Sequence, residues 1–277
     1  DAPRKLLAFL DFYASHQSTS VWYMGQKWGY GRPAAPWHYP FIITLATVPA
    51  WIALLTAVGI MRAVLQFISR PVPILFLMLL FTFLGISALP AAPKYDGERL
   101  FFPAFLFLAL LAGGGFSGLA AAAREAALGS HYRPGTDIQA IIRSQNFGAT
   151  LVLLACVLGG SWIVYRSHPN ELNYFNKWFA EGTKGAEEYG FETSYWGEAL
   201  NEEVTQWLTE NIESGQKVKV LAMEGLVFRH LQEWGRLPED INFEPESPPY
   251  DWFILQNRKG FFGNLERTLF SKQPFKV

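Results

Sequence analysis

The sequence contains a single cysteine among its 277 residues, Cys156, and this residue lies inside an apolar stretch. An intrachain disulfide is therefore excluded, and neither a zinc site nor a CxxC redox site can be proposed. The sequence also lacks GxSxG, HExxH and Walker motifs, and no Ser, His and Asp set stands out. The common hydrolase, zinc-protease and nucleotide-binding motifs are absent, and we expect no cofactor.

The sequence has no cluster of basic residues of the kind that binds nucleic acid. Residues 1–165 hold 11 Lys and Arg against 6 Asp and Glu, whereas residues 166–277 hold 12 against 18. The acidic C-terminal part and the formal net charge of −1 leave no basic stripe that could neutralise a nucleic-acid backbone. We therefore expect no nucleic-acid partner. The change of net charge near Arg166 indicates a boundary between two domains.

Charged residues are also absent from four long stretches. Each has 20 or more residues, close to the length that a helix needs to cross about 30 Å of hydrocarbon: 40–61, 71–90, 100–123 and 144–165. We predict four transmembrane helices over residues 40–165, surrounded by membrane lipid. Pro49 is expected to kink the first helix, and glycines in the third and fourth allow close packing. The absence of acidic residues from these stretches argues against an ion-coupled or proton-coupled transporter.

Beyond Arg166 the pattern changes to short polar and apolar segments typical of a folded aqueous domain. We predict an amphipathic helix, a strand, a second helix and a second strand in the order 197–212, 217–222, 226–234 and 251–256, with 241–244 as a possible third strand. Residues 166–277 are therefore expected to form a small α/β domain built on a βαβ unit. It has no phosphate-binding loop, because Gly225 stands without a GxGxxG pattern.

The N-terminal residues 1–39 form an amphipathic and aromatic segment. Its first ten residues have neither the apolar core nor the cleavage site of a signal peptide. Because the segment opens in the middle of an amphipathic pattern, we interpret the chain as part of a longer protein.

The segment between the second and third predicted spans concentrates polar residues at a membrane surface. It contains Lys94, Tyr95, Asp96, Glu98 and Arg99 within a few positions. Arginine offers a planar fork that matches phosphate oxygens, and lysine offers a point charge. The segment is either a phosphate site at the depth of the headgroups, with Lys94 and Arg99 as its cations, or an ordinary polar flank of two helices.

Aromatic residues crowd the segment before the first predicted span. Residues 20–40 contain three Trp and three Tyr together with Lys27, Arg32 and His38. Such a segment can lie in the membrane interface, or it can line a pocket for a polar headgroup with an aliphatic tail. Both interpretations stay open, and in the second His38, Tyr95, Asp96 and Glu98 are candidate pocket residues.

A polar motif, HPNELNYFN, follows the last predicted span at residues 168–176. His168 and Glu171 are three residues apart and could share a helix face. A metal ion needs more ligands than these two, so we predict no metal site here.

Several segments, taken in order, resemble the C-terminal half of bacterial members of the protein O-mannosyltransferase family, whose relatives include the lipid A aminoarabinose transferases. The matching segments are PWHYPFIITLATVP at 36–49, KYDGERLFFPAFLFLALLAGGG at 94–115, HPNELNYFN at 168–176 and GTKGAEEYGFETSYWGEALNEEVTQWL at 182–208. The third segment and the SYWG pattern of the fourth are the most specific, because hydropathy does not explain them.

The resemblance implies a membrane glycosyltransferase of the bacterial inner membrane. Such an enzyme takes its sugar from a polyprenyl-phosphate donor and transfers it on the extracytoplasmic face. Residues 1–39, the Lys94–Arg99 segment and the α/β domain would then face outward, with Lys94 and Arg99 at the donor phosphate.

This sequence departs from the family at one position of chemical importance. The acidic residue or pair that the family carries in its first outer loop has no counterpart here. Inverting transfer needs a carboxylate to accept the proton of the acceptor hydroxyl. We assign that role to none of Asp11, Asp96 and Glu98, and expect the fragment alone to be inactive. The alternative is a membrane-anchored binding or scaffolding protein without catalysis.

Overall fold

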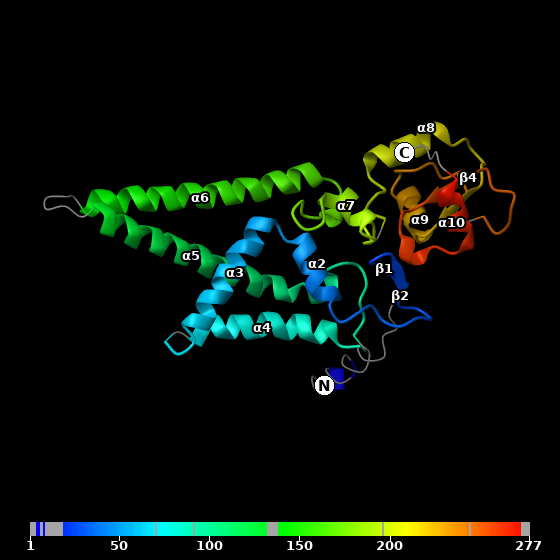
Figure 1. Cartoon of the computed structure of the whole chain (residues 1–277). Helices are drawn as coiled ribbons and strands as arrows, with labels where there is room; N and C mark the ends of the chain where they lie inside the picture. The colour runs from blue at the N-terminus through cyan, green and yellow to red at the C-terminus, as the bar shows by residue number, and fades with distance from the viewer. Residues whose placement is uncertain are drawn as a thin grey trace. The chain divides into compact units, whose positions relative to one another are not determined.

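The computed structural model of the chain (Figure 1) describes residues 4, 5, 8, 19–69, 71–90, 92–131, 138–195, 197–243 and 245–272, and no side chain between 127 and 147. Asp11, Trp196 and the end of the possible third strand at Glu244 lie outside these residues. The chain divides into two compact units. The helical unit comprises 1–17, 36–168 and 175–182, and the mixed unit comprises 18–35, 169–174 and 183–277.

The helical unit contains α2 (Tyr39–Thr47), α3 (Ala50–Leu65), α4 (Pro71–Ala88), α5 (Pro103–His131) and α6 (Ile138–Ser167). Three of these are long and apolar enough to cross a membrane, over Pro71–Ala88, Pro103–Ala126 and Gly148–Ser167, with mean hydropathy of 2.2, 1.9 and 1.9. They occupy three of the four predicted spans. The structure is therefore mostly helical and has the helices of a membrane protein.

The first predicted span, 40–61, consists of two shorter helices, α2 and α3, which are separated at Val48 and Pro49. Val48 is extended (φ −77°, ψ 133°). Pro49 has no N–H to offer the carbonyl of Leu45, so the chain cannot continue as one regular helix. The prediction of a kink at Pro49 is confirmed. α3 is the longer of the two pieces and is apolar, but its 16 residues make it shorter than the three membrane-length helices.

The break between α2 and α3 is stabilised by Asn176, which is 3% exposed. Its side-chain amide donates to the carbonyl oxygens of Leu45 and Val48, and its backbone N–H donates to Ala46 O at 2.7 Å. Its Oδ1 accepts from the backbone N–H of Phe179 at 2.8 Å. Carbonyls that lose their partners at a helix end must be paired when they are buried. Asn176 therefore takes over the hydrogen bonds that the helix break removes.

Helices α3 and α5 cross at very short range because glycines stand at the crossing. A Cβ on Gly115 would lie 2.0 Å from Leu55 O, and one on Gly59 would lie 1.9 Å from Leu111 O. Thr56 adds a hydrogen bond from its Oγ1 to Leu108 O at 3.3 Å. Small residues thus allow two backbones to approach, as predicted for the third span.

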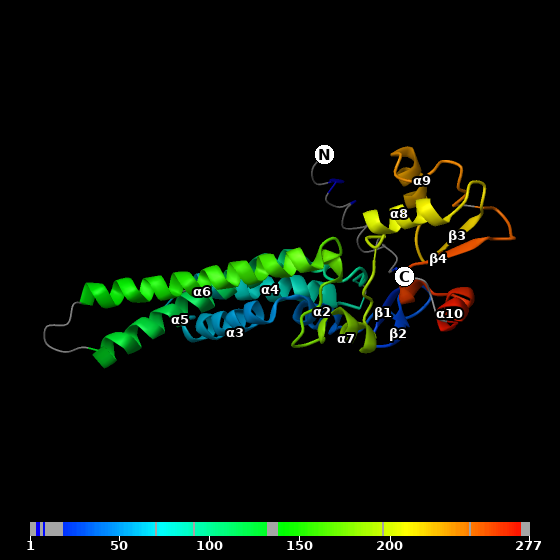
Figure 2. The ribbon, with the colours of Figure 1, turned by 90° about the horizontal axis from the view of Figure 1, so that it is seen from above.

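The mixed unit contains a hairpin and a small parallel sheet. Strands β1 (Val21–Tyr23) and β2 (Gln26–Trp28) pair antiparallel, and β3 (Val218–Leu221) pairs with β4 (Trp252–Leu255) in parallel. The helices of this unit are α8 (Glu202–Asn211), α9 (Leu226–Glu233), α10 (Asn264–Ser271) and most of α7 (Gly182–Glu188). Along the chain α9 follows β3 and precedes β4, as the colours of Figure 2 show. This is the predicted strand–helix–strand order.

A hydrophobic core holds this βαβ part together. Phe228 of α9 is fully buried and stacks on Phe243 with ring centroids 4.7 Å apart. Val218 and Leu208 close the same core from β3 and α8. The possible third strand is reduced to one bridge, between Lys217 and Asn242. Residues 21–28 were not predicted as a hairpin.

Candidate functional site

Lys94 lies in the loop between α4 and α5 and is 2% exposed. Its ammonium donates to Leu89 O at 2.6 Å and to Ala92 O at 3.3 Å. These carbonyls follow the C-terminal end of α4, where a cation is favourable. None of the described carboxylates forms an ion pair with Lys94, and burial lowers the pKa of its amine. The side chain stabilises the loop and leaves a positive charge within it.

Arg99 and Asp96 form the outer part of the same loop. Asp96 and Gly97 both adopt positive φ values, of 55° and 63°, which turns the chain into the short helix η1 (Arg99–Phe101). The Nη1 of Arg99 lies 3.8 Å from Oδ2 of Asp96, and the arginine side chain is 56% exposed whereas that of Asp96 is buried. A ligand from outside can thus reach the guanidinium of Arg99.

Glu98 is the carboxylate of the loop with the clearest change in acidity. It occupies the position before η1 and is half-buried. Burial raises the pKa of its carboxyl, although a bond to its own backbone N–H opposes this. It forms no ion pair with any residue that the structure describes. A carboxyl with a raised pKa can accept or hold a proton closer to neutral pH than an ordinary glutamate.

The start of α2 lies beside this loop. The buried ring of Tyr39 meets Phe101 of η1 edge-on, with centroids 6.5 Å apart. His38, the residue before α2, contacts the ring of Trp37 at 5.7 Å. The structure therefore brings the region of His38 and the Tyr95–Arg99 loop to the same end of the helical unit (Figure 1).

The mixed unit contains a pocket, which we call the basic pocket, and the part of it that comes from residues 259–271 was not predicted from the sequence. It has a volume of about 500 Å³ and lies between the β1–β2 hairpin, the turn η3 (Lys259–Phe261) and α10. Its cations are Lys27, Arg32, Lys259 and Arg267. Part of the aromatic segment at 20–40 therefore lines a pocket, together with residues from the end of the chain.

Lys259 of the basic pocket is already paired within the protein. Its ammonium lies 2.8 Å from Oε1 of Glu187, which also accepts from Asn257 at 2.9 Å. Burial alone would raise the pKa of Glu187, but the hydrogen bonds from Lys259 and Asn257 and the charge of Lys259 lower it. This ion pair fixes η3 to α7.

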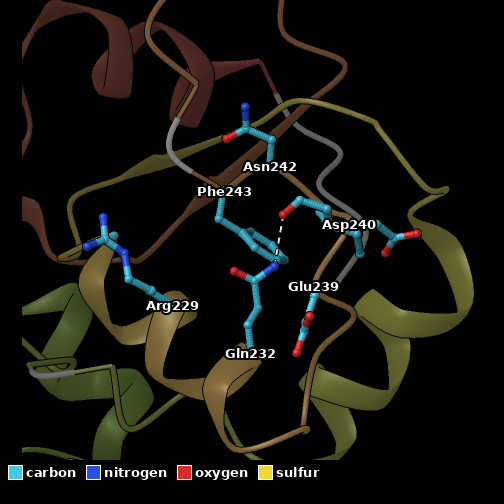
Figure 3. Close-up of a pocket in the computed structure, with 8 residues that line it drawn as sticks. Arg229, Gln232, Glu239, Asp240, Asn242 and Phe243 are labelled. Carbon is cyan, nitrogen blue, oxygen red and sulfur yellow. Dashed lines mark hydrogen bonds between the residues drawn. The ribbon is translucent and has the colours of Figure 1, made fainter.

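A second pocket, of about 380 Å³, lies beside α9 (Figure 3). Glu239 and Asp240 stand opposite Arg229 on its walls, so its charge is mixed. Gln232 closes part of it by donating to Ile241 O at 2.9 Å and to Pro238 O at 2.7 Å. Because Gln232 is bonded to carbonyls of the 238–241 segment and the wall carries charges of both signs, this pocket is the weaker candidate for a ligand.

No three His, Cys, Asp or Glu side chains come together as a metal site in the part of the chain that the structure describes. Comparison of the chain with protein-family models, with curated proteins and with solved structures gives no match. The loop at Lys94–Arg99, the membrane-length helices and the basic pocket are therefore the features of this chain that bear on its function.

Proposed function

We propose that this chain is the C-terminal part of an integral membrane glycosyltransferase of the bacterial inner membrane. The enzyme takes a sugar from a polyprenyl-phosphate donor and transfers it to an acceptor on the extracytoplasmic face. The observation that carries the proposal is the α4–α5 loop. There a buried lysine that has no carboxylate partner among the described residues, an accessible arginine and a carboxyl of raised pKa follow one another at the end of two membrane-length helices.

Helix order supports a common face for the polar segments. If α4, α5 and α6 each cross the bilayer, the α4–α5 loop and the chain after α6 emerge on the same side. In the proposed orientation this side is extracytoplasmic. The α4–α5 loop then stands at the depth of the lipid phosphate.

The roles within the loop follow from accessibility. Arg99 is exposed and binds the donor phosphate through its fork, whereas Lys94 holds the loop and adds positive charge nearby. Both cations stabilise the phosphate as it departs. The carboxylate that accepts the acceptor's proton belongs to sequence upstream of this chain, and Glu98, Asp96, Tyr95 and His38 contribute to the pocket wall.

The test uses the longer enzyme, reconstituted in lipid nanodiscs with a labelled polyprenyl-phosphate sugar. Arg99→Ala should lower transfer at least about tenfold, because one charge-assisted contact to the phosphate is lost. Arg124→Ala, which removes an exposed arginine from α5, is the matched control and should transfer as the wild type does. Turnover that is unchanged in Arg99→Ala would remove this residue from the site.

The second candidate function is a membrane-anchored binding protein without catalysis. It is supported by the mixed unit, whose βαβ part has its own hydrophobic core. Capture of a protein partner by the full chain, together with equal affinity of the membrane helices for phosphorylated and uncharged polyprenyl lipids, would favour this function over transfer.

A further inference from the structure

Three cations of the basic pocket have no side-chain partner in the part of the chain that the structure describes. Lys27, Arg32 and Arg267 form no side-chain hydrogen bond or ion pair with any residue that the structure describes. They come from both ends of the chain, from β2 and the loop after it and from α10. No Asp or Glu is among the residues that line the cavity.

The gathering of these charges is electrostatically unfavourable while the pocket holds no anion. Burial lowers the pKa of Lys27, and the neighbouring charges of Arg267 and Arg32 lower it further. Glu266 and Glu192 oppose this effect as weaker influences. The carboxylate of Glu266 caps the start of α10, where its Oε2 accepts a hydrogen bond from Gly263 N at 2.9 Å. An anion in the cavity would relieve the repulsion between the cations.

Aromatic rings give the same cavity an apolar wall. Trp22, Phe262 and Phe270 line it, and Phe262 is only 4% exposed. The ammonium of Lys259 stands 5.3 Å from the centre of the Phe270 ring, which keeps this wall next to positive charge. Figure 2 shows α10 beside the hairpin that completes the pocket.

We propose that the basic pocket binds an organic phosphate, with Arg32, Arg267 and Lys27 on the phosphate oxygens and the aromatic rings on the sugar or glyceride part. Arginine forks match two phosphate oxygens at once, and lysine adds a point charge. The volume of about 500 Å³ is that of a small-molecule site and encloses one headgroup. An extended acidic peptide would place most of its length outside the cavity.

The phosphate can come from a soluble sugar phosphate or from a lipid headgroup, and two probes distinguish these sources. The full chain in nanodiscs of phosphatidylcholine is titrated with glucose 1-phosphate and, separately, with dihexanoyl phosphatidic acid. Dihexanoyl phosphatidylcholine, whose phosphate is masked by choline, and a hexaglutamate peptide serve as controls. Binding of either phosphate probe above both controls supports the pocket, and the tighter of the two identifies the source.

The double variant Arg32→Gln/Arg267→Gln locates the binding. Both side chains are exposed and serve no described contact, so the fold should persist, as thermal unfolding would verify. Affinity for the phosphate probe should fall at least about tenfold, because two charge-assisted contacts are lost. Lys272→Gln removes one positive charge next to α10 but outside the cavity and should change affinity less than about threefold.

Three results would overturn the proposal. These are binding of neither phosphate probe, binding that persists in the double variant, and tighter binding of hexaglutamate than of both phosphates. The last result would assign the pocket to an acidic protein segment.

Discussion

Asn176 illustrates how a single polar side chain stabilises the break between two apolar helices, α2 and α3. It pairs the carbonyls of Leu45, Ala46 and Val48, which are freed where Pro49 interrupts the helix. In a buried site each of these groups would otherwise be without a hydrogen bond. The last residue of the HPNELNYFN motif thus has a structural role, joining the segment after α6 to the first pair of helices.

Replacement of Asn176 by Ala should destabilise the helical unit by about 2–4 kcal/mol, since two carbonyls and the N–H of Phe179 lose their partner. Thermal unfolding in nanodiscs measures the change. Asn211→Ala, which removes an exposed amide at the end of α8, is the control and should shift the midpoint little. Equal stability of the two variants would show that the helix break does not depend on Asn176.

At the residue scale the sequence predicted the composition of the α4–α5 loop but not its geometry. Lys94 and Arg99 were both predicted at the donor phosphate, yet the first is buried against carbonyls and the second is exposed. Residue type and spacing do not determine this difference. It depends on the chain just after α4, where the carbonyls of Leu89 and Ala92 accept from the ammonium of Lys94.

The helices that could be predicted were those with a clear local pattern in the sequence. Charge-free stretches located α4, α5 and α6, and amphipathic spacing located α8 and α9. The hairpin at 21–28 was missed because its strands have three residues each and its turn, Met24–Gly25, lacks the usual Asn or Asp. The Asn176–Val48 contact joins residues 128 positions apart, which no local pattern indicates.

At the element scale, the crossing of α3 and α5 should tolerate no side chain at Gly115. Gly115→Ala places a Cβ against backbone and should cost about 1–3 kcal/mol, since one helix must move. Gly113→Ala, two residues earlier on the same helix, meets no atom within 4 Å and is the matched control. The comparison is made by thermal unfolding in nanodiscs. Equal midpoints for the two variants would contradict the close crossing.

At the scale of the whole molecule, two groups of cations lie in different units. The Arg99 loop belongs to the membrane-length helices, and the basic pocket belongs to the mixed unit. The sequence left open a pocket lined by the 20–40 segment, but it did not indicate that α10 completes it, because Lys27 and Arg267 lie near opposite ends of the sequence. Only the fold places the hairpin against η3 and α10.

Lipid binding to the full chain in nanodiscs measures whether the α4–α5 loop binds the phosphate of a polyprenyl lipid, as we propose. Undecaprenyl phosphate is compared with undecaprenol in the Arg32→Gln/Arg267→Gln background, so that the basic pocket does not contribute. We predict preference for the phosphorylated lipid, and loss of that preference in the additional variant Arg99→Ala but not in Arg124→Ala. Equal binding of the two lipids, or a preference that persists without Arg99, would contradict the claim.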